Sequence, residues 1–301
     1  MSATKRIVVF GGNGFLGSRI CRAAVARNWD VTSVSRSGRP NWLSITSSPT
    51  PPGWSHSVTW ERGDIFRPAQ WTSLLYGADY VVHSLGILLE ADYKGVISGR
   101  ESPISGLARA FGPAPAGAAN PLERVRRLEE ESEKSETKKE EGGGGGGAPQ
   151  LTYEMMNRDS TILLAKEAAQ AGVGAFGFVS AAAGAPVLPS RYLSTKREAE
   201  EVVAREFPGM RGVFFRPPFM YDKSRGVTMG VAAMATAGSV FDGLTGGRVG
   251  GFLGSMVMKP LKVDVVADAV VEALADESVK GPVEVPQLEQ LAEQAWRKTM
   301  L

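Results

Sequence analysis

Three glycines near the start of the sequence have the spacing of an anion-binding turn. Gly11, Gly14 and Gly17 follow an apolar run, Ile7 to Phe10, whose β-branched residues predict a buried parallel strand. Gly11 allows a tight turn, Gly14 a close approach of the backbone to a pyrophosphate, and Gly17 close packing of a helix on the strand. The predicted helix, Ser18 to Asn28, would direct unpaired N–H groups and its dipole at a phosphate. The alternative is a glycine turn without a ligand.

The residues after the second predicted strand, Asp30 to Ser35, indicate which nucleotide is bound. An acid at this position would accept hydrogen bonds from the ribose hydroxyls of NAD. This chain has Ser35, Arg36, Ser37, Gly38 and Arg39 instead, and hydroxyl and guanidinium groups suit a 2′-phosphate. The sequence therefore predicts that NADP(H) is preferred over NAD(H), unless Arg36 is a solvated loop residue.

Tyr192 and Lys196 place a phenol and an ammonium group four positions apart. On a helix such a pair lies on one face. The pair comes about a dozen residues after a predicted strand, Ala175 to Ser180, and this position strengthens the catalytic interpretation. The alternative is an amphipathic helix, Tyr192 to Glu206, whose Lys196 and Arg197 are simply solvated.

Strands alternate with helices along the chain, which predicts an α/β fold. The architecture expected is a Rossmann-like, doubly wound parallel sheet of six or seven strands. It would form a single NAD(P)-binding domain over residues 1–301, with a small C-terminal substrate lobe at about 226–263. The other expected elements are strands Val58 to Glu61, Ala78 to Leu85 and Arg211 to Pro218, a short helix Gln70 to Tyr76, and helices ending at Ala171 and Leu274.

Composition excludes several other classes of protein. The 301 residues carry a net charge of +2, which gives no electrostatic support for nucleic-acid binding. Two histidines and one cysteine provide no metal-ligand spacing, and His83 in an apolar strand reads as a core residue. No apolar run reaches the length of a transmembrane helix. The first 29 residues hold five basic residues and no acid, which either reflects an import signal or a basic helix near phosphate.

A charged and glycine-rich insert interrupts the pattern. Residues Glu123 to Glu141 include eight acids and six bases, and Gly142 to Gly147 are six consecutive glycines. Such a segment cannot bury enough apolar surface to offset the entropy of ordering. We predict a largely disordered insert at about 113–150, with at most a solvated helix around Leu122 to Lys139.

The glycine turn, the Tyr192/Lys196 pair and the V-x-D-V-A-like segment Pro260 to Asp268 resemble the extended short-chain dehydrogenase/reductase superfamily. The resemblance implies that Tyr192 donates or accepts the carbonyl proton, while Lys196 lowers the phenol pKa and binds the nicotinamide ribose. It implies that Ser180 orients the substrate carbonyl, although alanines follow it where extended members often have the hydroxyl. Asp64 would contact adenine or cap a helix. The full set of implied cofactor-binding residues is Gly11, Asn13, Gly14, Phe15, Leu16, Gly17, Ser35, Arg36, Asp64, Ile65, Leu85, Gly86, Lys196 and Pro217.

Within that superfamily, several strings resemble the branch of fungal mitochondrial coenzyme Q (ubiquinone) biosynthesis proteins. They are VVFGGNGFLGSRIC, SVSRSG, VVHSLGILLE, YEMMNRDS, YLSTKREAE and RPPFMYD. This branch is related to the nucleotide-binding accessory subunit of respiratory complex I. The resemblance implies a mitochondrial protein on the matrix side of the inner membrane, in a multiprotein ubiquinone-synthesis complex. It implies a hydrophobic, quinone-like substrate and allows peripheral membrane association. Two functions remain open: an oxidoreductase, or a nucleotide-binding structural subunit of a quinone-synthesis or respiratory assembly.

Overall fold

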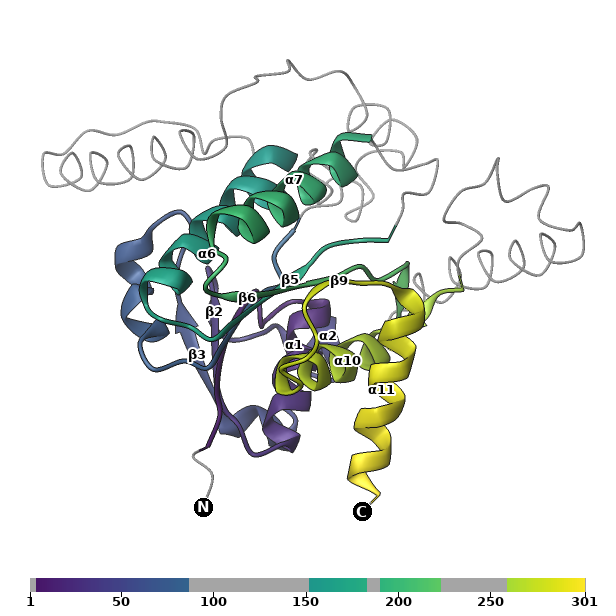
Figure 1. Cartoon of the computed structure of the whole chain (residues 1–301). Helices are drawn as coiled ribbons and strands as arrows, with labels where there is room; N and C mark the ends of the chain where they lie inside the picture. Colours follow the sequence, from purple (N-terminus) through teal and green to yellow (C-terminus); the bar gives the residue numbers. More distant parts are fainter. Residues whose placement is uncertain (1–3, 87–151, 183–189, 223–258, 301) are drawn as a thin grey trace, which may run out of the picture.

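A seven-stranded parallel sheet lies at the centre of the protein (Figure 1). The structure is a computed structural model, and it describes residues 4–86, 152–182, 190–222 and 259–300. The strand order is β3-β2-β1-β4-β5-β6-β9, and every pairing is parallel, as predicted. The strands are β1 (Arg6–Phe10), β2 (Asp30–Ser35), β3 (Val58–Arg62), β4 (Tyr80–His83), β5 (Ala175–Val179), β6 (Arg211–Phe215) and β9 (Gly281–Val283).

Helices cover both faces of this sheet (Figure 1). One face is covered by α1 (Phe15–Ala26), α10 (Val263–Ala275) and α11 (Val285–Thr299). The other is covered by α6 (Ser160–Gln170) and α7 (Ser190–Glu206). The strand order reverses between β1 and β4, where a doubly wound sheet binds its ligand. The shorter elements are α2 (Trp42–Thr46), η1 (Gly53–Ser57), η2 (Pro68–Gln70), η3 (Thr72–Leu75), the π-helix η4 (Glu154–Asp159), and the paired strands β7 (Met220–Tyr221) and β8 (Leu261–Lys262).

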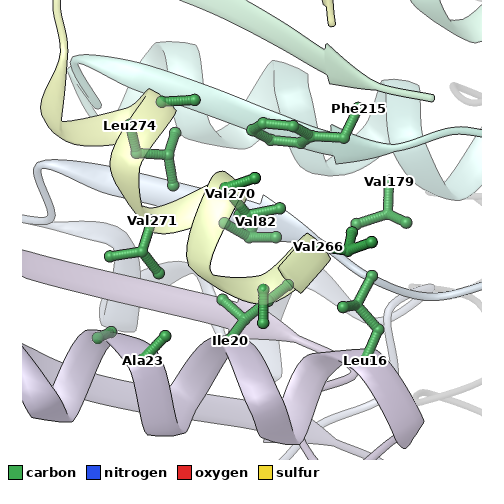
Figure 2. Packing of buried hydrophobic residues seen from close by; sticks show 14 of the residues in the cluster. Leu16, Ile20, Ala23, Val82, Val179, Phe215, Val266, Val270, Val271 and Leu274 are labelled. Atoms are coloured by element: carbon green, nitrogen blue, oxygen red, sulfur yellow. The ribbon is translucent and has the colours of Figure 1, made fainter. Parts of the chain in front are cut away.

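The core explains why the inner strand β1 is apolar from Ile7 to Phe10. Successive residues of a strand face opposite sides of the sheet, and here both sides are covered. Val8 packs in the cluster beneath α6 and α7, whereas Val9 packs in the cluster beneath α1 and α10, and both are fully buried. Figure 2 shows Val266 and Val270 of α10 filling the space between the sheet and α1.

The structure differs from the predicted elements in a few places. The segment Gln70 to Tyr76 was predicted as one short helix, but the structure has two 3₁₀ turns here instead. Gln70 is the last residue of η2, and η3 follows it. The bond from the Trp71 N–H to the Pro68 carbonyl is typical of such a turn. Strand β6 ends at Phe215 because two prolines soon follow, which lack the N–H that a ladder needs. Strand β9 and helix α11 were not predicted. The predicted insert and most of the predicted substrate lobe lie outside the described residues.

Candidate functional site

The glycine turn between β1 and α1 has the geometry that its sequence predicts. Gly11 has φ +84°, a left-handed conformation that favours glycine, and its carbonyl oxygen accepts a 2.8 Å bond from the Gly14 N–H. A Cβ on Gly17 would lie 2.2 Å from that same oxygen, so only glycine fits there. A Cβ on Gly12 would lie 2.4 Å from Ser33 Oγ, so Gly12 faces the core, and the G-x-x-G-x-x-G pattern that starts at Gly11 is the one that surrounds the turn.

The beginning of α1 is open to an anion. Gly14 is the N-cap residue, and no side chain caps the helix. The first turn contains no acid, and the first bond along the helix runs from the Ser18 N–H to the Gly14 carbonyl at 3.1 Å. Since N–H groups of the first helical turn have no acceptor inside a helix, Leu16 and Gly17 can direct theirs at a phosphate.

The residues predicted to bind the nucleotide in the turn after β2 differ in whether they can reach a ligand. Ser35 is buried, and its hydroxyl donates to the Gly38 carbonyl at 2.9 Å, so it holds the turn together rather than facing a ligand. Arg36 is exposed. Asn13 of the glycine turn donates to Ser37 Oγ at 2.6 Å, which ties the two loops to each other. Of the two serine hydroxyls in the predicted segment Ser35 to Arg39, the one available to a nucleotide is thus that of Ser37.

Asp64 and Ile65 follow β3 and serve the local structure. The Asp64 carboxylate accepts a 3.1 Å bond from the Phe66 N–H, and the Asp64 carbonyl accepts one from the Trp71 indole at 2.9 Å. Ile65 is buried in the cluster beneath α6 and α7. These bonds stabilise the turn after β3, but Asp64 does not cap a helix, because η2 begins after Arg67 and no side chain caps it. The adenine contact of Asp64 stays a prediction.

The residues expected near the nicotinamide ribose converge at the end of β4. A Cβ added to Gly86 would lie 3.4 Å from Asn157 Oδ1 and 3.6 Å from Lys196 Nζ, so a glycine here leaves space between an amide and an ammonium group. A Cβ on Gly11 would lie 2.9 Å from Leu85 Cδ2, so Leu85 borders the glycine turn. The site therefore joins the carboxyl ends of β1 and β4 to α7.

Asn157 is the main residue that the sequence analysis left out of the site. It is fully buried, and within the described part of the chain neither atom of its amide has a hydrogen-bond partner. It lies in η4, a π-helix, and such turns occur frequently at functional sites. The signal was present, because Asn157 with Ser160 and Thr161 approximates the Asn, Gly, Thr pattern of extended superfamily members.

Burial sets the proton affinities of the Tyr192 and Lys196 pair. Lys196 is buried, donates to the Val179 carbonyl at 2.8 Å, and has its pKa lowered to about 7 by desolvation. Tyr192 is half-buried, and its pKa is raised to about 12. Desolvation is the larger cause, and the electrostatic effect of Tyr153 adds to it. The Lys196 Nζ lies 5.5 Å from the Tyr192 ring centroid. Desolvation thus shifts the phenol pKa in the direction opposite to the lowering that the resemblance implies.

Ser180 takes part in a buried ionic network. Its hydroxyl donates to Glu200 and accepts a 2.8 Å bond from Arg197 Nη1. Glu200 is also paired with Arg216, and this network joins α7 to the ends of β5 and β6. The predicted role of Ser180 as carbonyl orienter requires a hydroxyl free to donate, and here its proton is engaged.

Pro217 is buried nearby and accepts a 2.8 Å bond from the Ala182 N–H.

His83 is a core residue, as predicted. It is fully buried, its Nε2 lies 2.9 Å from Ser160 Oγ, and desolvation lowers its pKa to about 3. It is therefore neutral at pH 7. Among the described residues no group of His, Cys, Asp and Glu side chains could hold a metal ion. The same residues include no helix long and apolar enough to cross a membrane.

Comparison with known proteins identifies the family. The chain is 37% identical over 237 residues to MIOREX complex component 2 of Saccharomyces cerevisiae, an alignment that covers 73% of this chain and 74% of the yeast protein. Residues 7–91 match the NAD dependent epimerase/dehydratase family. The chain therefore belongs to the family of the yeast MIOREX protein. An uncharacterized chloroplastic protein of Arabidopsis thaliana is 46% identical over 83 residues, which cover 28% of this chain and 25% of that protein.

Solved structures show the epimerase/dehydratase fold. The UDP-Glc/GlcNAc 4-epimerase of Campylobacter jejuni is 15% identical with a TM-score of 0.53, over 95% of this chain and 82% of that one. The UDP-glucuronic acid 4-epimerase of Bacillus cereus, in complex with NAD, is 15% identical with a TM-score of 0.51, over 93% and 78%. At this identity the likeness concerns the fold alone.

The residues of this family member fit a nicotinamide nucleotide. The open first turn of α1 suits a pyrophosphate, because it offers N–H donors and contains no acid. At the other end, the Asn157 amide is buried without a partner beside Gly86, where a Cβ would fill the space. A buried amide of this kind gains from a polar ligand that can pair with it.

Proposed function

We propose that this protein is an NADP(H)-dependent oxidoreductase of the short-chain dehydrogenase/reductase type that acts on a hydrophobic, quinone-related substrate. The observation that carries the proposal is the convergence of Lys196, Asn157 and Gly86 at the carboxyl end of the sheet, beside Tyr192. Family membership supports a nicotinamide nucleotide, and the exposed Arg36 supports a 2′-phosphate. When bound, the nicotinamide would supply or accept the hydride.

The chain's own residues would hold the nucleotide and move the proton. Gly11 to Gly17 would bind the pyrophosphate, and Lys196 and Asn157 would hold the nicotinamide ribose from the side of α7 and η4. In the reducing direction Tyr192 would donate its phenolic proton to the substrate oxygen as hydride reaches the carbonyl carbon, leaving a phenolate beside the Lys196 ammonium. A protonated Lys196 would stabilise that phenolate, and its pKa of about 7 leaves the amine partly protonated at neutral pH.

The cellular setting belongs to the same proposal. The resemblance to coenzyme Q biosynthesis proteins supports a role in mitochondrial ubiquinone biosynthesis on the matrix side of the inner membrane. The yeast relative is named as a complex component, which supports membership of a multiprotein assembly. A hydrophobic substrate accords with the methionines and phenylalanines between residues 226 and 254, which lie outside the described part of the structure.

A direct assay tests this activity. Purified protein would be mixed with NADPH and a short-chain ubiquinone analogue, and nucleotide oxidation followed by absorbance. We expect turnover that falls by about 10²–10⁴-fold in Tyr192→Phe, the usual contribution of general acid catalysis. Tyr76→Phe is the matched control, because that phenol is 65% exposed and far along the chain from the pair. Equal rates in Tyr192→Phe and the unmutated protein would contradict the assigned role.

A second function is favoured by one specific feature. The Ser180 hydroxyl is engaged by Glu200 and Arg197, and the next two residues are alanines. A nucleotide-binding structural subunit would need no carbonyl-orienting hydroxyl, and the yeast relative is a complex component. Nucleotide binding without NADPH oxidation of any quinone or carbonyl substrate would support this alternative.

A further inference from the structure

Three exposed arginines at the ends of β2 and β3 have no acidic partners among the described residues. Arg36 and Arg39 follow β2, Arg62 is the last residue of β3, and all three are exposed. In the described part of the chain no carboxylate forms an ion pair with any of them. Because like charges repel one another, a bound anion would stabilise this arrangement.

Arg62 is held in a defined position at the β2 turn. The β2–β3 register pairs it with Ser35, and its Nε lies 3.4 Å from the Arg36 carbonyl oxygen, to which it donates. A Cβ on Gly38 would lie 2.9 Å from Arg62 Cγ and 3.7 Å from Cδ, so the stem of the arginine packs on the turn. With Nε directed at the protein, the terminal N–H groups of the guanidinium remain for a ligand.

Ser37 supplies a hydroxyl donor beside them. A serine hydroxyl can donate once and accept twice. Asn13 Nδ2 fills one acceptor position of Ser37 Oγ at 2.6 Å, which leaves the O–H free to donate. Ser35 differs, because its O–H already donates to the Gly38 carbonyl. Since Asn13 belongs to the glycine turn, this bond places Ser37 at the edge of the nucleotide site.

We infer that Arg62 and Ser37 determine nucleotide specificity by binding the 2′-phosphate of NADP(H) together with Arg36. The inference rests on the proposed NADP(H) function and deepens it by naming Arg62, which lies outside the segment after β2 that normally decides the preference, and by choosing Ser37 over Ser35 within that segment. Arg62 contributes a guanidinium from the neighbouring strand, and Ser37 contributes the hydroxyl that Ser35 cannot.

Titration calorimetry with two nucleotide fragments tests the inference. The probe 2′,5′-ADP carries the 2′-phosphate, and 5′-AMP is the same molecule without it. Arg62→Gln should weaken 2′,5′-ADP binding by roughly tenfold or more and leave 5′-AMP binding unchanged, since hydrogen bonds to charged groups are the stronger ones. Ser37→Ala should cause a smaller loss, roughly fivefold. Lys280→Gln is the matched control, because Lys280 is exposed and precedes β9, at the opposite edge and opposite end of the sheet.

The outcomes separate this inference from the proposed function. If the unmutated protein prefers 2′,5′-ADP and Arg62→Gln keeps that preference with an unchanged melting temperature, the inference is wrong and the function stands. If the unmutated protein binds both fragments equally, the NADP(H) preference and the inference both fail. If it binds neither fragment and no intact nucleotide, the proposed function itself fails. The inference is supported if Arg62→Gln loses the preference for 2′,5′-ADP while Lys280→Gln keeps it.

Discussion

The Lys196 Nζ donates a 2.8 Å hydrogen bond to the carbonyl oxygen of Val179, the last residue of β5. This contact joins α7 to the sheet at a buried amine, which forms no ion pair with a carboxylate of the described residues. Its pKa falls to about 7 from 10.5 because burial disfavours the charged form, and Glu200 compensates only in part.

Stability should therefore depend on pH through Lys196. Between pH 7 and 10.5 the unfolded chain holds the lysine proton more often than the folded chain does, so the free energy of unfolding rises with pH in this window. The slope contributed by one group is at most about 1.4 kcal/mol per pH unit. Denaturant titrations at pH 7.5 and 9.5 would measure it. In Lys196→Met the increase of the unfolding free energy with pH should disappear. An identical increase in the variant and the unmutated protein would contradict the assigned burial of Lys196.

The Ser180 network leads to a prediction that distinguishes a structural from a catalytic hydroxyl. Ser180→Ala should lower the free energy of unfolding by about 1 kcal/mol, the usual value for one hydrogen bond, and leave NADPH turnover within about twofold. Glu200→Gln should cost more, on the order of 3 kcal/mol, because the carboxylate is buried and pairs with Arg197 and Arg216. Ser194→Ala is the control, since Ser194 is exposed on the same helix. A turnover loss of 10²-fold in Ser180→Ala, with unchanged stability, would restore its predicted role.

Cofactor choice is predicted to depend on Arg36. In Arg36→Asp a carboxylate replaces the guanidinium at the position where NAD-binding proteins accept bonds from the ribose. Calorimetry should show NADPH binding more tightly than NADH in the unmutated protein, and a narrowed or reversed preference in the variant. Lys280→Asp removes and reverses the same charge at the opposite edge of the sheet and should change neither affinity. Equal affinity for both nucleotides before mutation would contradict the prediction.

The sheet could be predicted from sequence because its strands are buried on both faces. Runs such as Ile7 to Phe10 are therefore continuously apolar and end at glycines. Strand β9 was missed because it is short and contains a proline, which resembles a turn more than a strand. Residue types at the glycine turn were enough to predict its geometry, because local sterics decide it.

Side-chain partners could not be predicted in the same way. Whether Ser180 faces a ligand depends on Glu200 and Arg216, which reach it from other elements of the fold. The same holds for Arg62, whose position beside the β2 turn follows from strand register and not from its neighbours in sequence. That the Asn157 amide is buried without a partner could not be predicted either, because it depends on the packing of η4 beside Gly86, which follows β4.

The last prediction separates the two proposed functions in living cells. Variants would be introduced into a strain from which the gene for this chain has been deleted, and growth and quinone content measured. If the protein is a reductase, Tyr192→Phe should fail to restore either, because it lacks the proton donor. Gly86→Val should fail as well, since its side chain would fill the space beside Asn157 and Lys196. A Cβ there makes only ordinary contacts, so we expect this variant to fold, which a thermal melt would check.

If the protein is a nucleotide-dependent structural subunit, the two variants should behave differently. Tyr192→Phe should restore growth and quinone content fully, because the scaffold needs the bound nucleotide and not the proton. Gly86→Val should still fail. Tyr76→Phe should restore both measures under either function, since its exposed phenol lies outside the site. Rescue by both Tyr192→Phe and Gly86→Val would contradict both functions, because neither proton transfer nor the nicotinamide end of the nucleotide would then be needed.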